Sequence, residues 1–183
     1  MTSSGDLDVG SQLQKLIRSV PGFPHEPIIF RDITPLLADP HGLGQAVYAL
    51  AQPFENQKID LVVGAESRGF IFGATVATHL SCGFVPIRKL GKLPCPTIRQ
   101  EYQLEYGTDI LEIHADAIKP DQRVLLVDDL LATGGTMFAC CQMVEKLGGK
   151  IVGISFLIEL AFLHGRNKLQ PYPIHSVISY QTE

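Results

Sequence analysis

Unbroken apolar runs alternate along this chain with segments in which apolar residues recur every three or four positions. The runs predict buried strands at residues 60–64, 84–88, 124–127 and 151–158, and a final strand is expected at residues 174–180. The spaced segments predict amphipathic helices at residues 9–20, 39–54, 70–80 and 137–147. Strands that alternate with helices predict an α/β fold with a mostly parallel, twisted sheet flanked by helices.

The stretch at residues 124–136 combines a predicted strand, an acidic pair, a glycine turn and the start of a helix. Asp128 and Asp129 stand where the strand is expected to end, and Gly134 and Gly135 precede the helical pattern. Ligands in open α/β sheets bind beyond the carboxyl ends of strands. A helix N-terminus also offers N–H groups and partial positive charge to a phosphate. We therefore expect a ligand site here.

The residue types in this turn fit two parts of one ligand. Glycines let an anion approach the backbone closely, and Thr133 and Thr136 add hydroxyl donors. Asp128 and Asp129 repel a phosphate, so they are better placed to accept hydrogen bonds from a sugar's vicinal hydroxyls or to help hold Mg²⁺, which prefers oxygen ligands. An anion cradle beside such a pair predicts a site for a ribose 5-phosphate.

The sequence Asp-Asp-Leu-Leu-Ala-Thr-Gly-Gly-Thr at residues 128–136 resembles the ribose-phosphate motif of the type I phosphoribosyltransferases. Its form is similar to that of the adenine enzymes, because the hypoxanthine-guanine enzymes typically open the motif with Glu-Asp and the orotate enzymes carry a different turn. A plain β-turn-α corner is the alternative, which a lone Gly-Gly would favour. The resemblance implies that the ribose 5-phosphate is bound by Asp128, Asp129, Ala132, Thr133, Gly134, Gly135 and Thr136.

A second strand-turn-helix pattern, at residues 60–80, has Ser67 and Arg68 at the start of its helix. The guanidinium of Arg68 offers a planar set of donors suited to phosphate oxygens. Seen in isolation, such an arginine would more often pair with a surface carboxylate. The turn Gly-Ala-Glu-Ser-Arg-Gly-Phe resembles the diphosphate-binding turn of the same family, which implies that Ser67 and Arg68 bind diphosphate.

The strand at residues 84–88 runs into a basic loop at residues 89–94. Arg88, Lys89 and Lys92 could receive the diphosphate, with arginine where the geometry is tight and lysine where it is loose. A solvated basic turn is the alternative reading of the same residues.

Residues 91–108 contain two prolines and predict a flexible lid loop that closes over substrates and excludes water. Their Leu-Glu-Tyr-Gly segment resembles the Ser-Leu-Glu-Tyr-Gly of the family, with Gln103 in place of the usual serine or threonine. The resemblance implies that Glu105 is the catalytic residue, sharing or supplying a proton at the base, and that Tyr106 belongs to the lid.

Residues 21–36 resemble the small N-terminal hood that covers the base in the adenine enzymes. The resemblance implies that Ile29 packs on adenine, that Arg31 fixes the hood and that Leu130 also contacts the base. Family members usually have Pro-Gly where this chain has Glu26-Pro27, and proline cannot take the positive φ open to glycine.

Composition and charge narrow the class of protein. The 183 residues, 45% hydrophobic and 19% charged, fit one globular domain over residues 1–183. The net charge of −4 argues against a nucleic-acid surface. Residues 1–10 are too polar for a signal peptide, and the most apolar stretch, residues 151–163, is too short to span a membrane. Four cysteines without metal-binding spacing predict buried thiols in a reducing cytoplasm.

Together, the residues and the resemblance predict an enzyme of purine salvage that transfers 5-phosphoribose from 5-phosphoribosyl 1-diphosphate to N9 of adenine, giving AMP and diphosphate. The resemblance also implies a homodimer and a Mg²⁺ cofactor bound through the substrate's diphosphate and ribose. One alternative is a phosphoribosyltransferase for another base. Another is a nucleotide-sensing regulator that keeps the fold without turnover. The intact acidic pair, Arg68 and Glu105 favour an enzyme, and about twenty residues ahead of the hood are too few for a DNA-binding winged helix.

Overall fold

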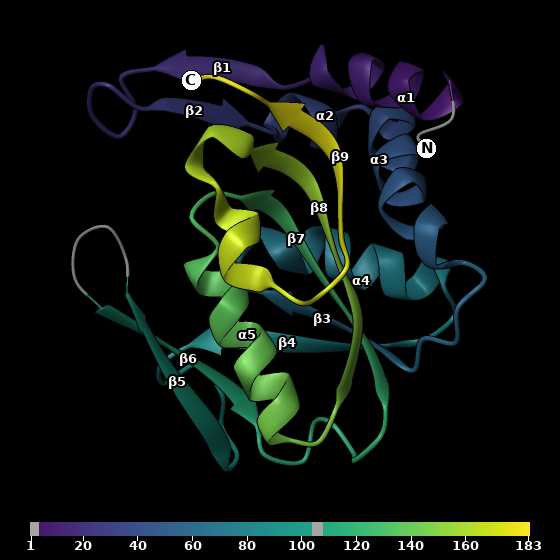
Figure 1. The fold of residues 1–183 in the computed structure, drawn as a ribbon, viewed down its shortest axis with the longest axis vertical. Coiled ribbons are helices and arrows are strands. Elements are labelled where there is room, and N and C mark those ends of the chain that lie inside the picture. Colours follow the sequence, from purple (N-terminus) through teal and green to yellow (C-terminus); the bar gives the residue numbers. More distant parts are fainter. Residues whose placement is uncertain (1–3, 104–107) are drawn as a thin grey trace.

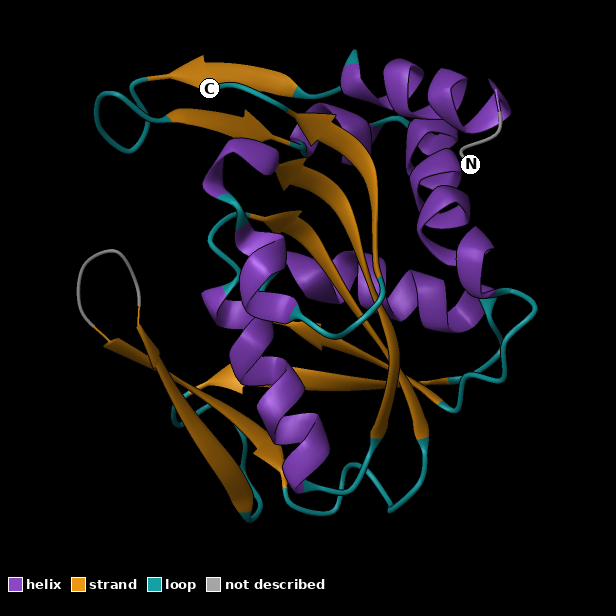
Figure 2. Cartoon of the chain, viewed as in Figure 1, coloured by secondary structure: helices purple, strands orange, loops and turns teal. Residues whose placement is uncertain are grey.

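Residues 4–103 and 108–183 are described in the computed structural model, and they form a seven-stranded sheet with helices on both faces (Figure 1 and Figure 2). The strands lie in the order β5-β6-β4-β3-β7-β8-β9. Their bounds are Leu61–Ala65 (β3), Gly83–Lys89 (β4), Thr97–Gln103 (β5), Thr108–His114 (β6), Arg123–Leu131 (β7), Lys150–Leu160 (β8) and Ile174–Tyr180 (β9). The five strands from β4 to β9 are parallel, whereas β6 is antiparallel to both β4 and β5. The predicted mostly parallel α/β sheet is therefore confirmed.

Helices cover the two faces of the sheet unequally. Helix α5, Gly135–Lys146, packs on one face, and α3, Pro40–Ala51, and α4, Arg68–His79, pack on the other (Figure 2). The boundary at α3 follows from its sequence, since the Asp39 carboxylate accepts a hydrogen bond from the Gly42 N–H at 2.6 Å. The remaining helices are α1 (Ser4–Gln14), α2 (Thr34–Ala38) and the 3₁₀ turns η1 (Gln52–Phe54), η2 (Ala161–Leu163) and η3 (Gly165–Leu169).

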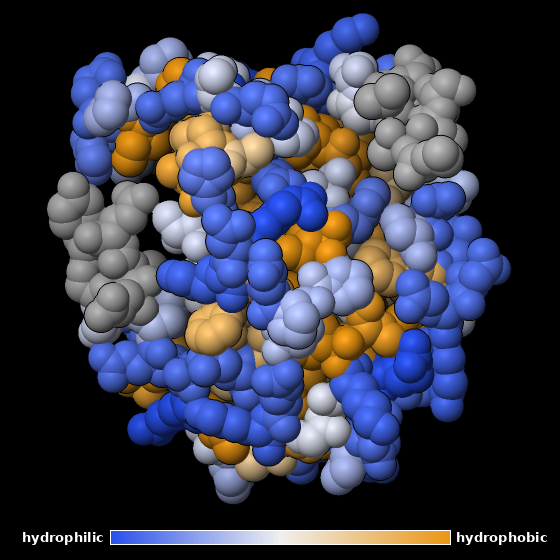
Figure 3. Space-filling model, in the orientation of Figure 1, coloured by the Kyte–Doolittle hydropathy of each residue, from blue (hydrophilic) through white to orange (hydrophobic). Residues whose placement is uncertain are grey.

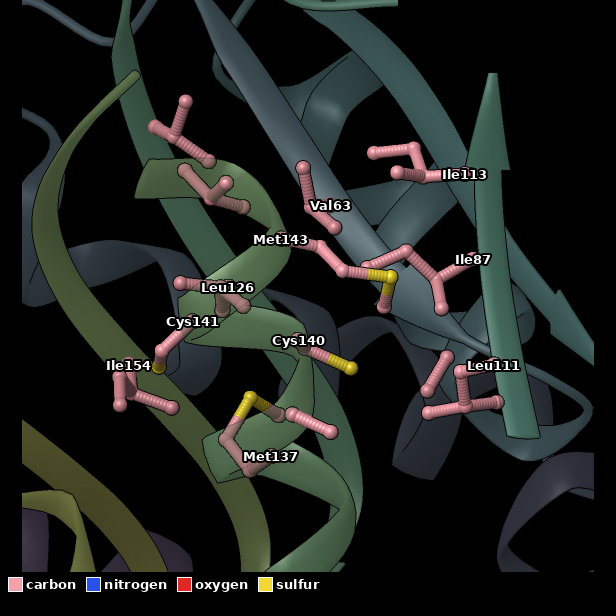
Figure 4. Packing of buried hydrophobic residues seen from close by; sticks show 14 of the residues in the cluster. Val63, Ile87, Leu111, Ile113, Leu126, Met137, Cys140, Cys141, Met143 and Ile154 are labelled. Carbon is pink, nitrogen blue, oxygen red and sulfur yellow. The ribbon is translucent and has the colours of Figure 1, made fainter. Parts of the chain in front are cut away.

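The face of the sheet under α5 holds a core that is rich in sulfur. Figure 4 shows Met137, Cys140, Cys141 and Met143 directed from α5 toward the strands, and all four are buried. Burial raises the pKa of the Cys140 thiol, and it raises that of Cys141 to about 12. These two cysteines therefore stay protonated at neutral pH and pack as small apolar residues.

All four cysteines are free thiols, but the prediction that they are buried was wrong for two of them. Cys95 is exposed and Cys82 is partly exposed. Cys95 stands between two prolines in the turn that leads into β5, outside any element that could bury it. Position in a turn, rather than residue type, therefore decides the exposure of this thiol.

The central strand β3 is the point at which the strand order reverses. The chain passes from β3 to β4 on one side of it and later to β7 on the other. Val62 faces the core under α3 and α4, whereas Val63 faces the core under α5, so both faces of β3 are covered by helices. A crevice opens beyond the carboxyl ends of strands at such a switch point.

The apolar stripe at residues 9–20 is not one helix. Helix α1 ends at Gln14, and β1, Arg18–Pro21, pairs antiparallel with β2, Ile29–Asp32. The helical prediction was wrong for residues 15–20 because the strand partner, with Phe30 opposite Val20, lies beyond the reach of a local pattern. The hood expected at residues 21–36 therefore contains the turn and the second strand of a hairpin, followed by the start of α2. The first strand of that hairpin begins earlier, at Arg18.

The segment at residues 91–108 is not one irregular loop. Strands β5 and β6 pair along their whole lengths, from Thr97 opposite His114 to Gln103 opposite Thr108. The loop prediction was wrong for residues 97–103, because Ile98 packs against the α5 core and the two prolines precede the strand instead of interrupting it. Residues 104–107, between the strands, lie outside the described residues.

Polar residues cover much of the face seen in Figure 3, and hydrophobic residues are exposed in patches between them. The exposed large apolar side chains of the described part of the chain include Phe23 in the hood, Tyr48 on α3 and Leu90 after β4. Among the helices of residues 4–103 and 108–183, none is long and apolar enough to cross a membrane.

Candidate active site

One cavity of about 570 Å³ lies at the carboxyl ends of β3 and β7, at the switch point of the sheet. Helices α4 and α5 both begin at its wall, so two partially positive helix ends face the same space. Its lining consists of Glu66, Ser67, Arg68, Lys89, Asp128, Asp129, Leu130, Leu131, Ala132, Thr133, Gly134, Gly135, Thr136, Met137 and Phe156.

The turn before α5 depends on a glycine. Gly134 is the N-cap residue of α5 and has a φ of 81°, in the left-handed region. A Cβ at this position would meet the carbonyl oxygen of Gly165 at 2.7 Å. The carbonyl of Gly134 accepts the first hydrogen bond of the helix, from the Phe138 N–H at 2.9 Å. The turn can therefore keep the free N–H groups of the helix end toward the cavity only with glycine here.

The acidic pair lies inside β7, not after it. Strand β7 continues to Leu131, because β8 offers paired residues as far as Glu159. The expectation that the strand ends at Asp128 was wrong for this reason. Burial, followed by the nearby charge of Asp129, raises the pKa of Asp128 well above its ordinary value. Burial also raises the pKa of Asp129, although the Arg68 guanidinium opposes that change.

Arg68 joins the two turns of the cavity. Its Nε lies 2.8 Å from Oδ2 of Asp129, yet that buried oxygen accepts no hydrogen bond of favourable geometry from the described residues. The contact therefore balances the charge of this buried carboxylate. The Arg68 guanidinium also lies 5.5 Å from the ring centre of Phe30, so the hood approaches this wall of the cavity.

The predicted basic residues are held by a carboxylate that the sequence analysis did not assign. Oε2 of Glu66 accepts hydrogen bonds from Nε of Arg88 at 3.1 Å and from the backbone N–H of Lys89 at 2.9 Å. Lys89 lines the cavity, whereas Arg88 and Lys92 do not. Arg88 instead reaches the Lys92 carbonyl with Nη1, at 3.4 Å. Glu66 was detectable in principle, because it lies within the Gly-Ala-Glu-Ser-Arg motif.

The hood residues lie next to the cavity but do not line it. Ile29 and Arg31 are in β2, outside the lining, and Leu130 in β7 is part of the lining. Nη1 of Arg31 donates a hydrogen bond to the Ser19 hydroxyl at 2.5 Å, and its guanidinium stacks 4.0 Å from the ring centre of Tyr180. Arg31 thereby ties β2 both to β1 and to the end of β9.

Two groups of residues remain, those that lie outside the described residues and those that the sequence analysis did not assign. Glu105 and Tyr106 lie outside the described residues. Leu131, Met137 and Phe156 line the cavity but were not predicted to do so. Phe156 lies opposite Asp128 in the pairing of β7 and β8, and this register is not readable from an apolar run.

Comparison with known proteins fits this geometry. Residues 37–181 match the phosphoribosyl transferase domain family. The adenine phosphoribosyltransferase of Rhodopirellula baltica is 56% identical over 168 residues, which cover 92% of this chain and 82% of that protein. This chain belongs to the phosphoribosyltransferase family, with its type I fold.

Solved structures place the chain within one branch of that family. The crystal structure of adenine phosphoribosyltransferase from Thermoanaerobacter pseudethanolicus superposes with a TM-score of 0.91 at 51% identity, covering 93% of this chain and 99% of that one. The Saccharomyces cerevisiae enzyme, complexed with adenine and an imino-altritol bisphosphate, gives 0.88 at 39% identity, covering 93% and 99%. The branch is therefore that of the adenine phosphoribosyltransferases.

Proposed function

We propose that this chain transfers the 5-phosphoribosyl group of 5-phosphoribosyl 1-diphosphate to N9 of adenine, forming AMP and releasing diphosphate. The observation that carries the proposal is the single cavity shared by the acidic pair, Arg68 and the start of α5. The N9–C1′ bond forms while the bond from C1′ to the diphosphate oxygen breaks, through an oxocarbenium-like transition state. Such a reaction needs aligned substrates, a neutralised leaving group and the exclusion of water.

The 5-phosphate is assigned to the turn at the start of α5. The turn lines the cavity, and the unpaired N–H groups of a helix end attract an anion without any charged side chain. Hydroxyl groups on either side of the glycines supply further donors. The residues in this assignment are Ala132, Thr133, Gly134, Gly135 and Thr136, all in the cavity lining.

The ribose hydroxyls are assigned to Asp128 and Asp129. Carboxylate oxygens accept hydrogen bonds from a diol, and both aspartates line the cavity. Negative charge near C1′ would also favour the cationic character that develops there. Their contribution is therefore both to orient the sugar and to stabilise the transition state.

The diphosphate is assigned to Ser67, Arg68 and Lys89, which line the cavity. Arg88 and Lys92 lie outside the lining and would contribute their positive charge from there. Arg68 and Lys89 carry positive charge to the cavity wall, and Glu66 fixes the backbone from which Lys89 extends. These cations would neutralise part of the charge that collects on the leaving group.

A Mg²⁺ ion fits the same end of the cavity. The paired carboxylates are the hard oxygen ligands that Mg²⁺ prefers, while no group of three metal-binding side chains exists among the described residues. The ion would therefore be held mainly by oxygens of the substrate, with Asp128 or Asp129 nearby. When bound, it would supply further charge neutralisation for the diphosphate.

Adenine is assigned to the space between the hood and Leu130. Ile29 would pack on the base, and Arg31 holds the hood through Ser19 and Tyr180. Glu105 is assigned the proton exchanged at adenine N7 as N9 becomes the nucleophile, on the strength of the sequence motif. Tyr106 is assigned to the lid on the same ground.

A competition assay tests this function. We expect AMP and diphosphate to form from 5-phosphoribosyl 1-diphosphate and adenine, and only with Mg²⁺ present. Hypoxanthine, guanine and orotate should react far less. They carry a carbonyl oxygen where adenine carries the N6 amino group, so the acceptor in the site that binds this amino group would be left without a hydrogen bond. Preferential use of another base would refute the assignment of adenine, and diphosphate release independent of any base would refute the transfer.

The acidic pair should also govern the acid limb of the pH profile. An ordinary aspartate has a pKa of about 3.9. Because the pKa of Asp128 is raised, its carboxylate takes up a proton at a higher pH than that. The value of kcat/KM for the ribosyl donor should therefore fall as the pH drops through that raised pKa. Asp129→Asn removes the like charge beside Asp128, so it should lower the maximum and move the acid limb to lower pH.

The pH prediction is checked by profiles of kcat/KM for the two proteins over the same buffers. Asp116→Asn, at an exposed aspartate after β6, serves as the control for loss of one charge. An acid limb at the same pH in wild type and Asp129→Asn would contradict the coupling of the two carboxyls.

Homodimer formation and a cytoplasmic location belong to the same proposal. Leu90, beside the basic residues at the end of β4, has 46% of its surface exposed, which suits a contact with a second copy. Four free cysteines suit a reducing compartment. Sedimentation equilibrium of the purified protein tests the dimer, and cell fractionation tests the location.

A further inference from the structure

Two polar side chains of the β5–β6 hairpin form contacts with the cation of β4 that lines the cavity. Nζ of Lys89 lies 3.2 Å from Oδ2 of Asp109, and the Tyr102 hydroxyl donates to the same oxygen at 3.4 Å. Burial is the first cause of the raised pKa of Tyr102, and the Thr136 side chain opposes it. Lys89 and Thr136 line the cavity, whereas Tyr102 and Asp109 do not.

The pairing of the strands brings these side chains together. Tyr102 lies directly opposite Asp109 in the β5–β6 pair. Lys89 lies opposite Leu111 in the β4–β6 pair, which makes Asp109 its diagonal neighbour on the same face of the sheet. That face is the one on which α5 packs, so Tyr102 and Asp109 lie on the same side of the sheet as this helix. The contacts therefore follow from register and not from a chance side-chain conformation.

The carboxylate of Asp109 competes with a bound anion in two ways. It occupies the ammonium of Lys89, the cation of β4 that faces the cavity, and it raises the pKa of that lysine. It also adds a negative charge close to the place where a diphosphate would lie, which repels the ligand. Glu66 takes only the backbone N–H of Lys89, so it leaves the ammonium to Asp109.

We propose that Asp109 is a positioning residue that keeps the Lys89 ammonium in an ion pair and so weakens the binding of diphosphate to the cavity. The proposal rests on the proposed function for the assignment of Lys89 to the diphosphate. Where product release limits the rate, as it does in many enzymes, weaker binding of diphosphate favours turnover. Asp109 acts through Lys89 and does not itself touch the substrate.

The test is the variant Asp109→Asn, which has the same shape and keeps an Oδ1 to accept the hydrogen bond from the Ile110 N–H at 2.8 Å. Titration calorimetry with sodium diphosphate and Mg²⁺ should show binding about threefold to fivefold tighter than in wild type, the scale of a half-exposed ion pair. The KM for 5-phosphoribosyl 1-diphosphate should fall as well. A merely structural role for Asp109 predicts the opposite, since a loosened site binds more weakly.

Two controls sharpen the result. Asp116 is an exposed aspartate that follows the last residue of β6, whereas Asp109 is near the first. Asp116→Asn removes the same charge and should leave diphosphate binding unchanged. In a Lys89→Gln background, Asp109→Asn should have little further effect, because the two residues act as a pair. Unchanged or weaker binding in Asp109→Asn would overturn the proposal. The proposal would also be overturned if Asp109→Asn tightened diphosphate binding by the same factor in the Lys89→Gln background.

The outcome separates this proposal from the proposed function. If AMP forms but Asp109→Asn fails to tighten diphosphate binding, only the role of Asp109 is wrong. If diphosphate binds and responds to Asp109→Asn while no AMP forms, the role of Asp109 stands and the transfer is wrong.

Discussion

Gly134→Val is expected to lower the affinity for AMP by about 100-fold or more. Gly134 has a φ of 81°, and a branched side chain is strongly disfavoured in that region. Its Cβ would also meet the Gly165 carbonyl oxygen at 2.7 Å, where backbone faces backbone and neither can yield easily. The turn must therefore move, and the N–H groups proposed to hold the 5-phosphate move with it. A cost of about 3 kcal/mol corresponds to a 100-fold loss of affinity.

Calorimetric titration with AMP measures this loss, and the thermal midpoint of each protein reports on folding. Gly44→Val is the matched control, because a Cβ at Gly44, on the exposed side of α3, meets no atom within 4 Å. Thr133→Val provides a second variant without backbone strain, and removal of its hydroxyl should weaken AMP binding about tenfold. Wild-type affinity for AMP in a folded Gly134→Val protein would contradict the assignment of the 5-phosphate to this turn.

Glu105→Gln is expected to lower kcat by about 100-fold, the usual scale for a residue that moves a proton in the transition state. Glutamine keeps the size of the side chain and its carbonyl acceptor but cannot exchange a proton at adenine N7. The KM values should change much less than kcat, since the interaction is made chiefly in the transition state. Glu105 itself lies outside the described residues, so this prediction depends on the sequence motif.

Steady-state kinetics with adenine and 5-phosphoribosyl 1-diphosphate measure the effect of Glu105→Gln. The control is Glu101→Gln, at an exposed glutamate of β5, which loses the same charge within the same hairpin. Glu101→Gln should turn over at the wild-type rate. A Glu105→Gln enzyme that does the same would show that the proton at the base is managed by another group.

The predicted elements were reliable where an element buries its own apolar residues in the sheet or on it. Strands β3, β7 and β8 carry continuous apolar runs because helices cover both of their faces. Helices α3, α4 and α5 show helical spacing because one side of each packs on the sheet. The strands that were missed, β1, β5 and β6, pair with a neighbouring strand through register that no local pattern shows, and the end of β7 was placed too early for the same reason.

In the candidate site, the sequence motifs predicted the residues of the two turns but not the side chains that contact the basic residues. The motif residues Arg68, Asp129 and Gly134 meet in one cavity. The partners that hold the basic residues, Glu66 and Asp109, were not predicted to do so. The ion-pair partner of a carboxylate cannot be predicted from the neighbouring sequence, because the cation is on a different strand.

The sequence alone determined the alternation of the core strands and helices, the mostly parallel sheet and the residue types of the turn before α5. These properties are local: a few consecutive residues carry the periodicity, the glycine or the acidic pair. Only the tertiary structure decided the strand partners of β1 and β5, the extension of β7 past Asp128 and the contact between Lys89 and Asp109. These depend on register and burial, to which residues far apart in the chain contribute together. The raised pKa values of the acidic pair belong to the second group, since burial is their first cause.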